Sequence, residues 1–183
     1  MSTVAERLTA DEYLARDDRR RTELIDGAVI VNEPSILHQH VCGLIYQALA
    51  AWTRSASGRG TATLPINVPL GEDNVLAPDV MWFDGELPLS AVNAPRAPDL
   101  VVEVRSPATW RFDIGRKRDL YERNGVAELW LADPFSRSVL VFRRPAREAP
   151  FGTPLELLAD DTMQSPLLPG FSAVVGDLIP AVA

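Results

Sequence analysis

The apolar residues of segment 36–56 recur at intervals of three and four positions, which is the spacing of one face of an α-helix. Seven residues make up this pattern: Leu37, Val41, Leu44, Ile45, Ala48, Leu49 and Trp52. The glycines of the following "SASGRG" segment predict the end of this helix. A shorter helix is predicted after Thr9, because Glu12 three residues later completes a capping-box pattern.

Short apolar runs bounded by turn residues predict strands in the rest of the chain. These runs are 23–25, 28–31, 61–70, 75–84, 99–106, 127–133 and 138–144, with a further short strand expected within 154–159. The first two flank Asp26-Gly27, a dipeptide that favours the tight turn of a β-hairpin. The third and fourth are expected to form an antiparallel pair around the turn "GEDN".

A helix predicted at 110–124 joins the strand at 99–106 to the strand at 127–133. Such a strand–helix–strand unit should be a right-handed crossover between parallel strands. The complete order of elements predicts an α/β (α+β) fold, with a mixed central β-sheet flanked by helices.

The chain has 183 residues, which is long enough for one domain with a real hydrophobic core. We therefore expect a single domain over 1–183, with its core at about 9–145 and a C-terminal extension at 146–183. No stretch approaches the roughly 18 apolar residues that span a membrane. The segment "MSTVAERLTADEYL" contains no apolar signal region, so we expect a cytoplasmic protein without membrane partners.

The net charge of −7 argues against binding to DNA through a broad basic surface, but leaves room for an enzyme with a local basic patch. The single cysteine, Cys42, excludes an internal disulfide and argues against cysteine-rich zinc sites. It lies beside the apolar stripe of segment 36–56, which predicts a role in helix packing.

Two predicted apolar strands each carry a carboxylate whose neighbours predict burial: Glu103 in "LVVEVRS" and Asp79 after Pro78. Ionised carboxylates are rarely buried unless they are paired or bind a metal. Lys117 shares the predicted apolar helix face with Ile114 and Tyr121, so it should point toward the sheet. Carboxylates on neighbouring strands can hold Mg²⁺ or Mn²⁺, and a nearby lysine suits metal-assisted phosphodiester cleavage.

A structural interpretation of the same residues stays open at this point. Asp79 and Glu103 can form a buried polar pair satisfied by Arg105 and Lys117, without any metal. Lys117 can equally pair with Asp113, four residues earlier on the helix.

Several segments resemble, in the same order, the Uma-two family of bacterial proteins described as restriction endonucleases, in the PD-(D/E)XK nuclease superfamily. The segments are "YLARDDRRRTELIDGAVI", "APDVMWF", "APDLVVEVRSPAT", "DIGRKRDLYERNGVAELWLADP" and "VLVFRR". The resemblance covers about residues 9–145. It implies a restriction-endonuclease-like core and a divalent-metal-dependent DNA endonuclease that hydrolyses phosphodiester bonds.

The resemblance also implies roles for individual residues. Asp79 matches the acid of the "PD" element and Glu103 the acid of (D/E)XK, so both are expected metal ligands and catalytic residues. Lys117 matches a catalytic lysine that has moved from the strand to the following helix, and Glu23 in "ELIDG" matches a further acid at the site. The lysine position of (D/E)XK is occupied by Arg105, which can hold phosphate, assist or replace Lys117, or pair with Glu103.

The two histidines, His38 and His40, lie two positions apart on one helix and do not face each other, which argues against a two-histidine metal site. For His38 both a substrate contact and a structural hydrogen bond stay open. Trp82 and Trp130 are predicted to pack in the core, whereas Trp110 is the better candidate for an exposed contact. The "RRR" at 19–21 is interpreted as a solvated turn or a phosphate contact.

Duplex DNA is the expected partner, because no aromatic stripe in a basic groove favours RNA or a single strand. Cleavage of both strands needs two sites, which favours a homodimer. The alternative function is a non-catalytic or weakly active nucleic-acid-binding or regulatory module on the same fold.

Overall fold

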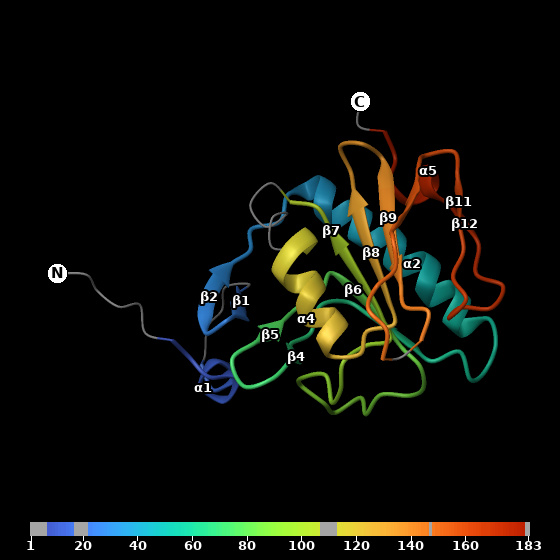
Figure 1. The fold of residues 1–183 in the computed structure, drawn as a ribbon. Helices are drawn as coiled ribbons and strands as arrows, with labels where there is room; N and C mark the ends of the chain where they lie inside the picture. The colour runs from blue at the N-terminus through green and yellow to red at the C-terminus, as the bar shows by residue number, and fades with distance from the viewer. Residues whose placement is uncertain (1–6, 17–21, 107–112, 147, 182–183) are drawn as a thin grey trace.

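The computed structural model describes residues 7–16, 22–106, 113–146 and 148–181 (Figure 1). Its helices are α1 (Ala10–Leu14), α2 (Ile36–Arg54), a π-helical turn (Asp113–Lys117), α4 (Arg118–Arg123) and α5 (Val175–Leu178). The strands of its first half are β1 (Thr22–Ile25), β2 (Ala28–Val31), β3 (Thr61–Thr63), β4 (Val68–Pro69), β5 (Val75–Leu76) and β6 (Val80–Phe83). Those of its second half are β7 (Leu100–Val104), β8 (Glu128–Asp133), β9 (Ser138–Arg143), β10 (Leu155–Leu157), β11 (Thr162–Met163) and β12 (Ala173–Val174).

The central sheet has the strand order β10-β9-β8-β7-β6-β3. Strands β7 and β8 are parallel, with Glu103 opposite Leu131, and the other neighbours are antiparallel. The predicted mixed central sheet with flanking helices is therefore confirmed. The parallel pairing expected for the two strands around the second long helical segment is confirmed as well.

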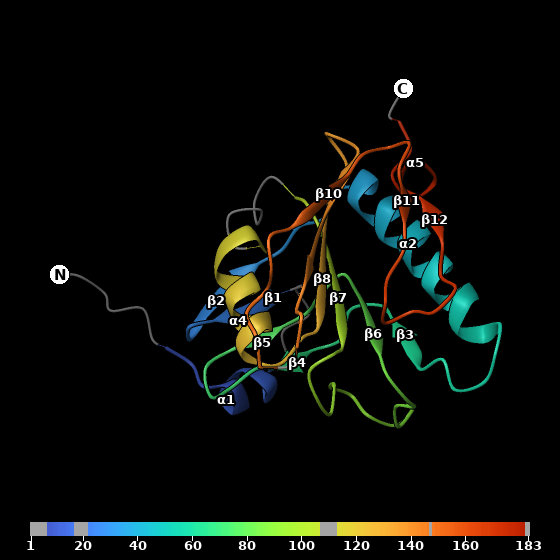
Figure 2. The ribbon, with the colours of Figure 1, turned by 45° about the vertical axis from the view of Figure 1, so that its right-hand side comes forward.

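Helices α2 and α4 cover opposite faces of the central sheet (Figures 1 and 2). Alternate residues of β7 belong to different cores: Val102 and Val104 pack with α2, whereas Val101 packs with Leu120 of α4. Because side chains alternate along a strand, Glu103 points to the face of Val101, toward α4. A strand that is buried on both faces thus presents one carboxylate to a helix.

A smaller sheet, in the order β2-β1-β5-β4, lies beside the central one. Its β1–β2 hairpin turns at Asp26 and Gly27, with φ angles of 50° and 75°. Positive φ at both central residues is what an Asp-Gly hairpin turn requires, so the predicted hairpin is confirmed.

The antiparallel pairing expected between 61–70 and 75–84 is also confirmed, but it is divided between the two sheets. β3 pairs with β6 in the central sheet, whereas β4 pairs with β5 in the smaller sheet. Pro65 and Pro78 lie in the two interruptions. Proline has no N–H for a strand ladder, which explains why the pairing breaks there.

Helix α2 begins after Ser35, whose hydroxyl accepts a hydrogen bond from the backbone of His38 at 3.2 Å. It ends at Arg54, two residues before the predicted end. The capping box at α1 is confirmed, because Thr9 and Glu12 exchange the expected hydrogen bonds.

The prediction for 110–124 was wrong in one respect. Residues 110–112 lie outside the described part, and the chain from Asp113 to Lys117 forms a π-helical turn before α4. A π-helical turn is wider than an α-helical one, so Ile114 does not share a face with Lys117. Ile114 is accordingly 41% exposed, although an inward position was expected.

The C-terminal segment 148–181 contains the expected short strand, β10, and also contributes to the hydrophobic core. Apolar residues of its later segments join the core beneath α2: Met163, Leu168, Phe171, Val175, Leu178 and Ile179. Within the described residues, every helix is too short or too polar to cross a membrane.

Candidate active site

The candidate site lies where the chain passes from the smaller sheet to the central one, at residues 77–79. Glu23 of β1 accepts a hydrogen bond from the backbone N–H of Ala77, 2.9 Å from its Oε1. Asp79 accepts one from the backbone N–H of Val104, 2.9 Å from its Oδ2. Both carboxylates are buried, so this short crossing segment carries one acid, Asp79, and is hydrogen-bonded to another, Glu23.

The register of the central sheet places a third acid beside them. The β6–β7 pairing ends at Val80 and Val102, so Asp79 lies one residue before the paired part of β6 and Glu103 one residue after that of β7. Glu103 is thus within a strand as expected, whereas Asp79 directly precedes the neighbouring strand.

Lys117 joins the acids from the helical side. Its Nζ lies 2.8 Å from Glu23 Oε2 and 3.2 Å from Glu103 Oε1, and the residue is only 1% exposed. Tyr121, one turn further along, donates a hydrogen bond from its hydroxyl to Glu103 Oε1. The inward orientation predicted for Lys117 is thus present, although the π-helical turn rather than an α-helix produces it. The alternative pairing of Lys117 with Asp113 stays a prediction, because the side chain of Asp113 lies outside the described part of the structure.

Acidic side chains predominate among the described residues of this site. Glu23 and Glu103 both contact the ammonium group of Lys117, and Asp79 is hydrogen-bonded to the residue that follows Glu103. Buried charges are costly unless they are compensated. Carboxylate oxygens are the hard ligands that Mg²⁺ and Mn²⁺ prefer, so Asp79 and Glu103 have the donor chemistry that a divalent cation needs.

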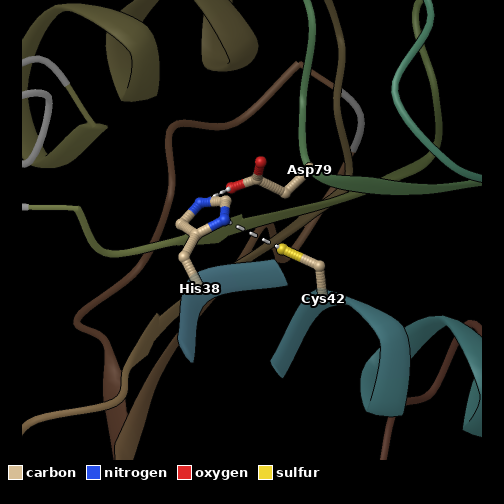
Figure 3. A group of neighbouring side chains, drawn as sticks. All are labelled: His38, Cys42 and Asp79. Atoms are coloured by element: carbon tan, nitrogen blue, oxygen red, sulfur yellow. Dashed lines mark hydrogen bonds and ion pairs between the residues drawn. The ribbon is translucent and has the colours of Figure 1, made fainter. Parts of the chain in front are cut away.

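His38 of α2 contacts Asp79 from the face of the sheet opposite to α4. Its Nε2 lies 3.1 Å from Asp79 Oδ2, and its Nδ1 lies 3.5 Å from the sulfur of Cys42 (Figure 3). All three side chains are buried. The packing role predicted for Cys42 omitted this contact, for which the four-residue spacing of His38 and Cys42 on a helix is the one sequence signal.

Arg105 lies apart from the contacts of Lys117. Its guanidinium donates to Asp133 Oδ2 at 2.6 Å and lies over the ring of Phe135, 5.5 Å from the centroid. Although partial burial raises the pKa of Asp133, hydrogen bonds from Arg105 and the Phe135 N–H outweigh it, so the pKa is lowered. Lys117, by contrast, donates a hydrogen bond directly to Glu103.

The predictions made for the tryptophans can be compared with the structure in two of three cases. Trp82 and Trp130 are 4% and 0% exposed, which confirms their prediction as packing residues. Trp110 and the arginine run 19–21 lie outside the described residues.

The family model of Uma2, described as "Putative restriction endonuclease", matches residues 10–176. The chain belongs to the Uma2 family. The match spans most of the chain, including the junction that carries the acids, and it supports a nuclease function, a kind of hydrolase.

A solved structure supports the fold. The crystal structure of a "putative nuclease belonging to DUF820" from Anabaena variabilis matches this Uma2 protein with a TM-score of 0.79 and 21% identity. The match covers 94% of this chain and 97% of the other, which confirms the nuclease-like α/β fold expected from the sequence. No match was found among the curated proteins.

Proposed function

We propose that this Uma2 protein is a divalent-metal-dependent DNA endonuclease that hydrolyses phosphodiester bonds. The observation that carries the proposal is that buried Glu23 and Glu103 meet at the ammonium group of Lys117, while buried Asp79 is hydrogen-bonded to the residue that follows Glu103. Buried carboxylates are rare unless they are paired with cations or bind a metal.

Asp79 and Glu103 would hold the ion, with Glu23 assisting directly or through water. Mg²⁺ is the expected metal and Mn²⁺ an alternative, since both accept carboxylate oxygens. When bound, the ion supplies a lower pKa for its water ligand and stabilises charge on the phosphate.

The protein's own cations complete the chemistry. Lys117, held between Glu23 and Glu103, orients the attacking water and stabilises the negative charge that develops on the phosphate in the transition state. Arg105, at the end of β7 and 36% exposed at its side chain, is proposed to contact a backbone phosphate of the substrate. Arginine stays protonated, so proton transfer is assigned to water and not to Arg105.

Duplex DNA is proposed as the substrate because the family is described as restriction endonucleases. A cut through both strands needs two active sites, so we propose that the acting form is a homodimer.

The test is cleavage of supercoiled plasmid by purified protein with Mg²⁺ or Mn²⁺, beside Glu103→Gln and an EDTA control. Nicking that needs metal and is lost in Glu103→Gln would support the endonuclease. Glutamine preserves the size of the side chain, so a folded variant separates lost chemistry from lost packing.

Mn²⁺ binding to the same proteins decides between the two functions. Tight plasmid binding without cleavage, from protein that binds no Mn²⁺, would favour a nucleic-acid-binding or regulatory module. Cleavage of RNA or single-stranded DNA in preference to the plasmid would overturn the duplex substrate but keep the metal site.

A further inference from the structure

Asp79 is the end point of a buried chain of three side chains. Cys42 and His38 lie one turn apart near the start of α2, and the imidazole of His38 turns one nitrogen toward each of its neighbours (Figure 3). The three residues are 4%, 2% and 2% exposed, in the order Cys42, His38, Asp79.

For an ionised Asp79 and a neutral imidazole, the donor and acceptor capacities of these groups give the chain one direction. An ionised carboxylate only accepts, so the proton between His38 and Asp79 belongs to Nε2 of the imidazole. In a neutral imidazole Nδ1 is then an acceptor, and the Cys42 thiol is the donor to it. The thiol thus favours the one tautomer that can donate to Asp79.

The carboxylate of Asp79 is held through one of its two oxygens, Oδ2. Its Oδ2 accepts from both the His38 Nε2–H at 3.1 Å and the backbone N–H of Val104 at 2.9 Å. Two donors on a single oxygen, one from a helix and one from a strand, leave the carboxylate little freedom to rotate. A carboxylate fixed in this way would present a constant orientation to a metal.

We infer that His38 and Cys42 are positioning residues that orient Asp79 for divalent-cation binding. The inference rests on the proposed function and deepens it, because it names what prepares the metal ligand. The buried imidazole, already engaged by Asp79 and Cys42, suits this role better than a direct contact with the substrate.

A metal held by the trio itself is the competing interpretation. The three side chains each bring a ligand atom within 4.8 Å of the others. The imidazole, however, lies between the thiol and the carboxylate and faces each with a different nitrogen. One ion can bind only one of those nitrogens, so a shared ion would require the ring to abandon one present hydrogen bond.

The experiment is direct titration of the full-length protein with Mn²⁺, followed by electron paramagnetic resonance, which reports affinity without any nuclease assay. His38→Ala should weaken Mn²⁺ binding by about 10- to 100-fold, the usual effect of removing a partner of a metal ligand. His38→Gln, whose amide N–H can replace Nε2–H, should bind within a few-fold of wild type. His40→Ala, exposed on the same helix, is the matched control and should bind as wild type does.

Cys42 provides an independent pair of variants. Cys42→Ser keeps a donor for Nδ1 and should preserve affinity, whereas Cys42→Ala removes the donor and should weaken binding. This pair keeps the inference testable even if His38→Ala proves unable to fold, and urea unfolding of each variant identifies such a failure.

The outcomes separate the two proposals. Equal Mn²⁺ affinity in wild type, His38→Ala and Cys42→Ala would overturn the positioning role while leaving the metal site intact. Wild-type protein that binds no Mn²⁺ would overturn the proposed function, and the inference with it. With Co²⁺ in place of Mn²⁺, a sulfur-to-cobalt charge-transfer band that disappears in Cys42→Ser would show that the thiol itself binds metal, which also overturns the inference.

Discussion

Lys117 and Glu23 form a buried ion pair, 2.8 Å from Nζ to Oε2, that joins the helical segment after β7 to the first strand of the smaller sheet. Their side chains are only 2% and 1% exposed. The pair therefore links two layers of the fold at the place where the proposed chemistry occurs.

Removal of Lys117 should destabilise the protein strongly. Lys117→Met keeps an apolar stem but leaves Glu23 and Glu103 buried without their cation, which we expect to cost about 3–5 kcal/mol of unfolding free energy. Urea unfolding measures the change. The double variant Lys117→Met/Glu23→Gln should recover part of the loss, because it removes one uncompensated charge. A single variant as stable as wild type would contradict this account.

Substitutions of the two candidate catalytic cations, Lys117 and Arg105, should affect different kinetic constants. Lys117→Ala is expected to lower kcat for plasmid nicking by about 100-fold or more, the usual effect of removing a donor that stabilises transition-state charge. Arg105→Ala should mainly raise KM for DNA, because its proposed contact with phosphate is the same in the ground and transition states.

Arg96 is the matched control for Arg105. It too pairs with an aspartate, Asp99 at 2.7 Å, and lies over an aromatic ring, 5.4 Å from the centroid of Phe83. It sits before β7, at the end of the strand opposite to Arg105, so Arg96→Ala should leave both constants unchanged. A larger loss of kcat in Arg105→Ala than in Lys117→Ala would reverse the assignment.

Metal should stabilise the folded protein. A ligand that binds only the native state raises the unfolding free energy by about 2.7 kcal/mol when present at 100 times its Kd. Mn²⁺ should therefore raise the melting temperature of wild type, and Glu103→Gln should abolish the shift. Asp99→Asn, an acid outside the site, should keep it. Equal shifts in wild type and Glu103→Gln would place the bound ion elsewhere.

The turn of the first hairpin should make stability depend on pH. Arg116 donates to both oxygens of Asp26, at 2.7 Å from Nε, and this hydrogen bond holds the pKa of Asp26 below its usual value. A carboxyl with a depressed pKa in the folded state stabilises above its unfolded-state pKa, and this contribution is lost as pH falls. Because the pair is partly exposed to solvent, which screens its attraction, it contributes at most about 1 kcal/mol.

Asp26→Asn is the appropriate variant, since asparagine tolerates the positive φ at this position. The difference in unfolding free energy between wild type and Asp26→Asn should be largest near pH 7 and vanish between about pH 5 and pH 2. In an Arg116→Gln background the difference should lose most of its pH dependence. A difference that stays constant over this range would exclude the ion pair as its source.

Two glycines of one loop allow the cost of a steric clash to be separated from the cost of a left-handed backbone conformation. Gly58 and Gly60 both have positive φ, 75° and 69°. A Cβ at Gly58 would meet open space, whereas at Gly60 it would lie 2.1 Å from the carbonyl oxygen of Phe83. Gly58→Ala should cost roughly 1–2 kcal/mol from the left-handed conformation alone, and Gly60→Ala clearly more. Thermal unfolding of both variants checks the order, which equal costs would contradict.

Local signals in the sequence were sufficient for part of this fold. The Asp26-Gly27 turn depends on two adjacent residues, and the stripe of α2 on one helix, so both could be predicted from spacing. The placement of Asp79 beside Glu103 followed from two apolar strands that carry acids. The orientation of Arg105 was left open, because a residue at a strand end can turn toward several partners.

The remaining features depend on contacts that spacing does not encode. The π-helical turn changes which residues share a face, so Ile114 was expected inside and lies outside. The division of one long hairpin between two sheets follows from how β5 pairs with β1, far away in the sequence. The contact of Tyr121 with Glu103, and that of Cys42 with His38, became visible only when the helices were placed on the sheet. The division into a core at 9–145 and an extension at 146–183 stays a prediction.

The origin of the site in both sheets has a consequence for biosynthesis. Glu23 is translated early, Glu103 much later, and Lys117 later still, whereas the crossing segment at 77–79 must already bridge the sheets for the acids to meet. A nascent chain on the ribosome therefore carries the parts of a nuclease without being one until the segment through α4 has emerged and docked. If the proposed activity holds, a partly synthesised chain would therefore not cleave nucleic acid near the ribosome.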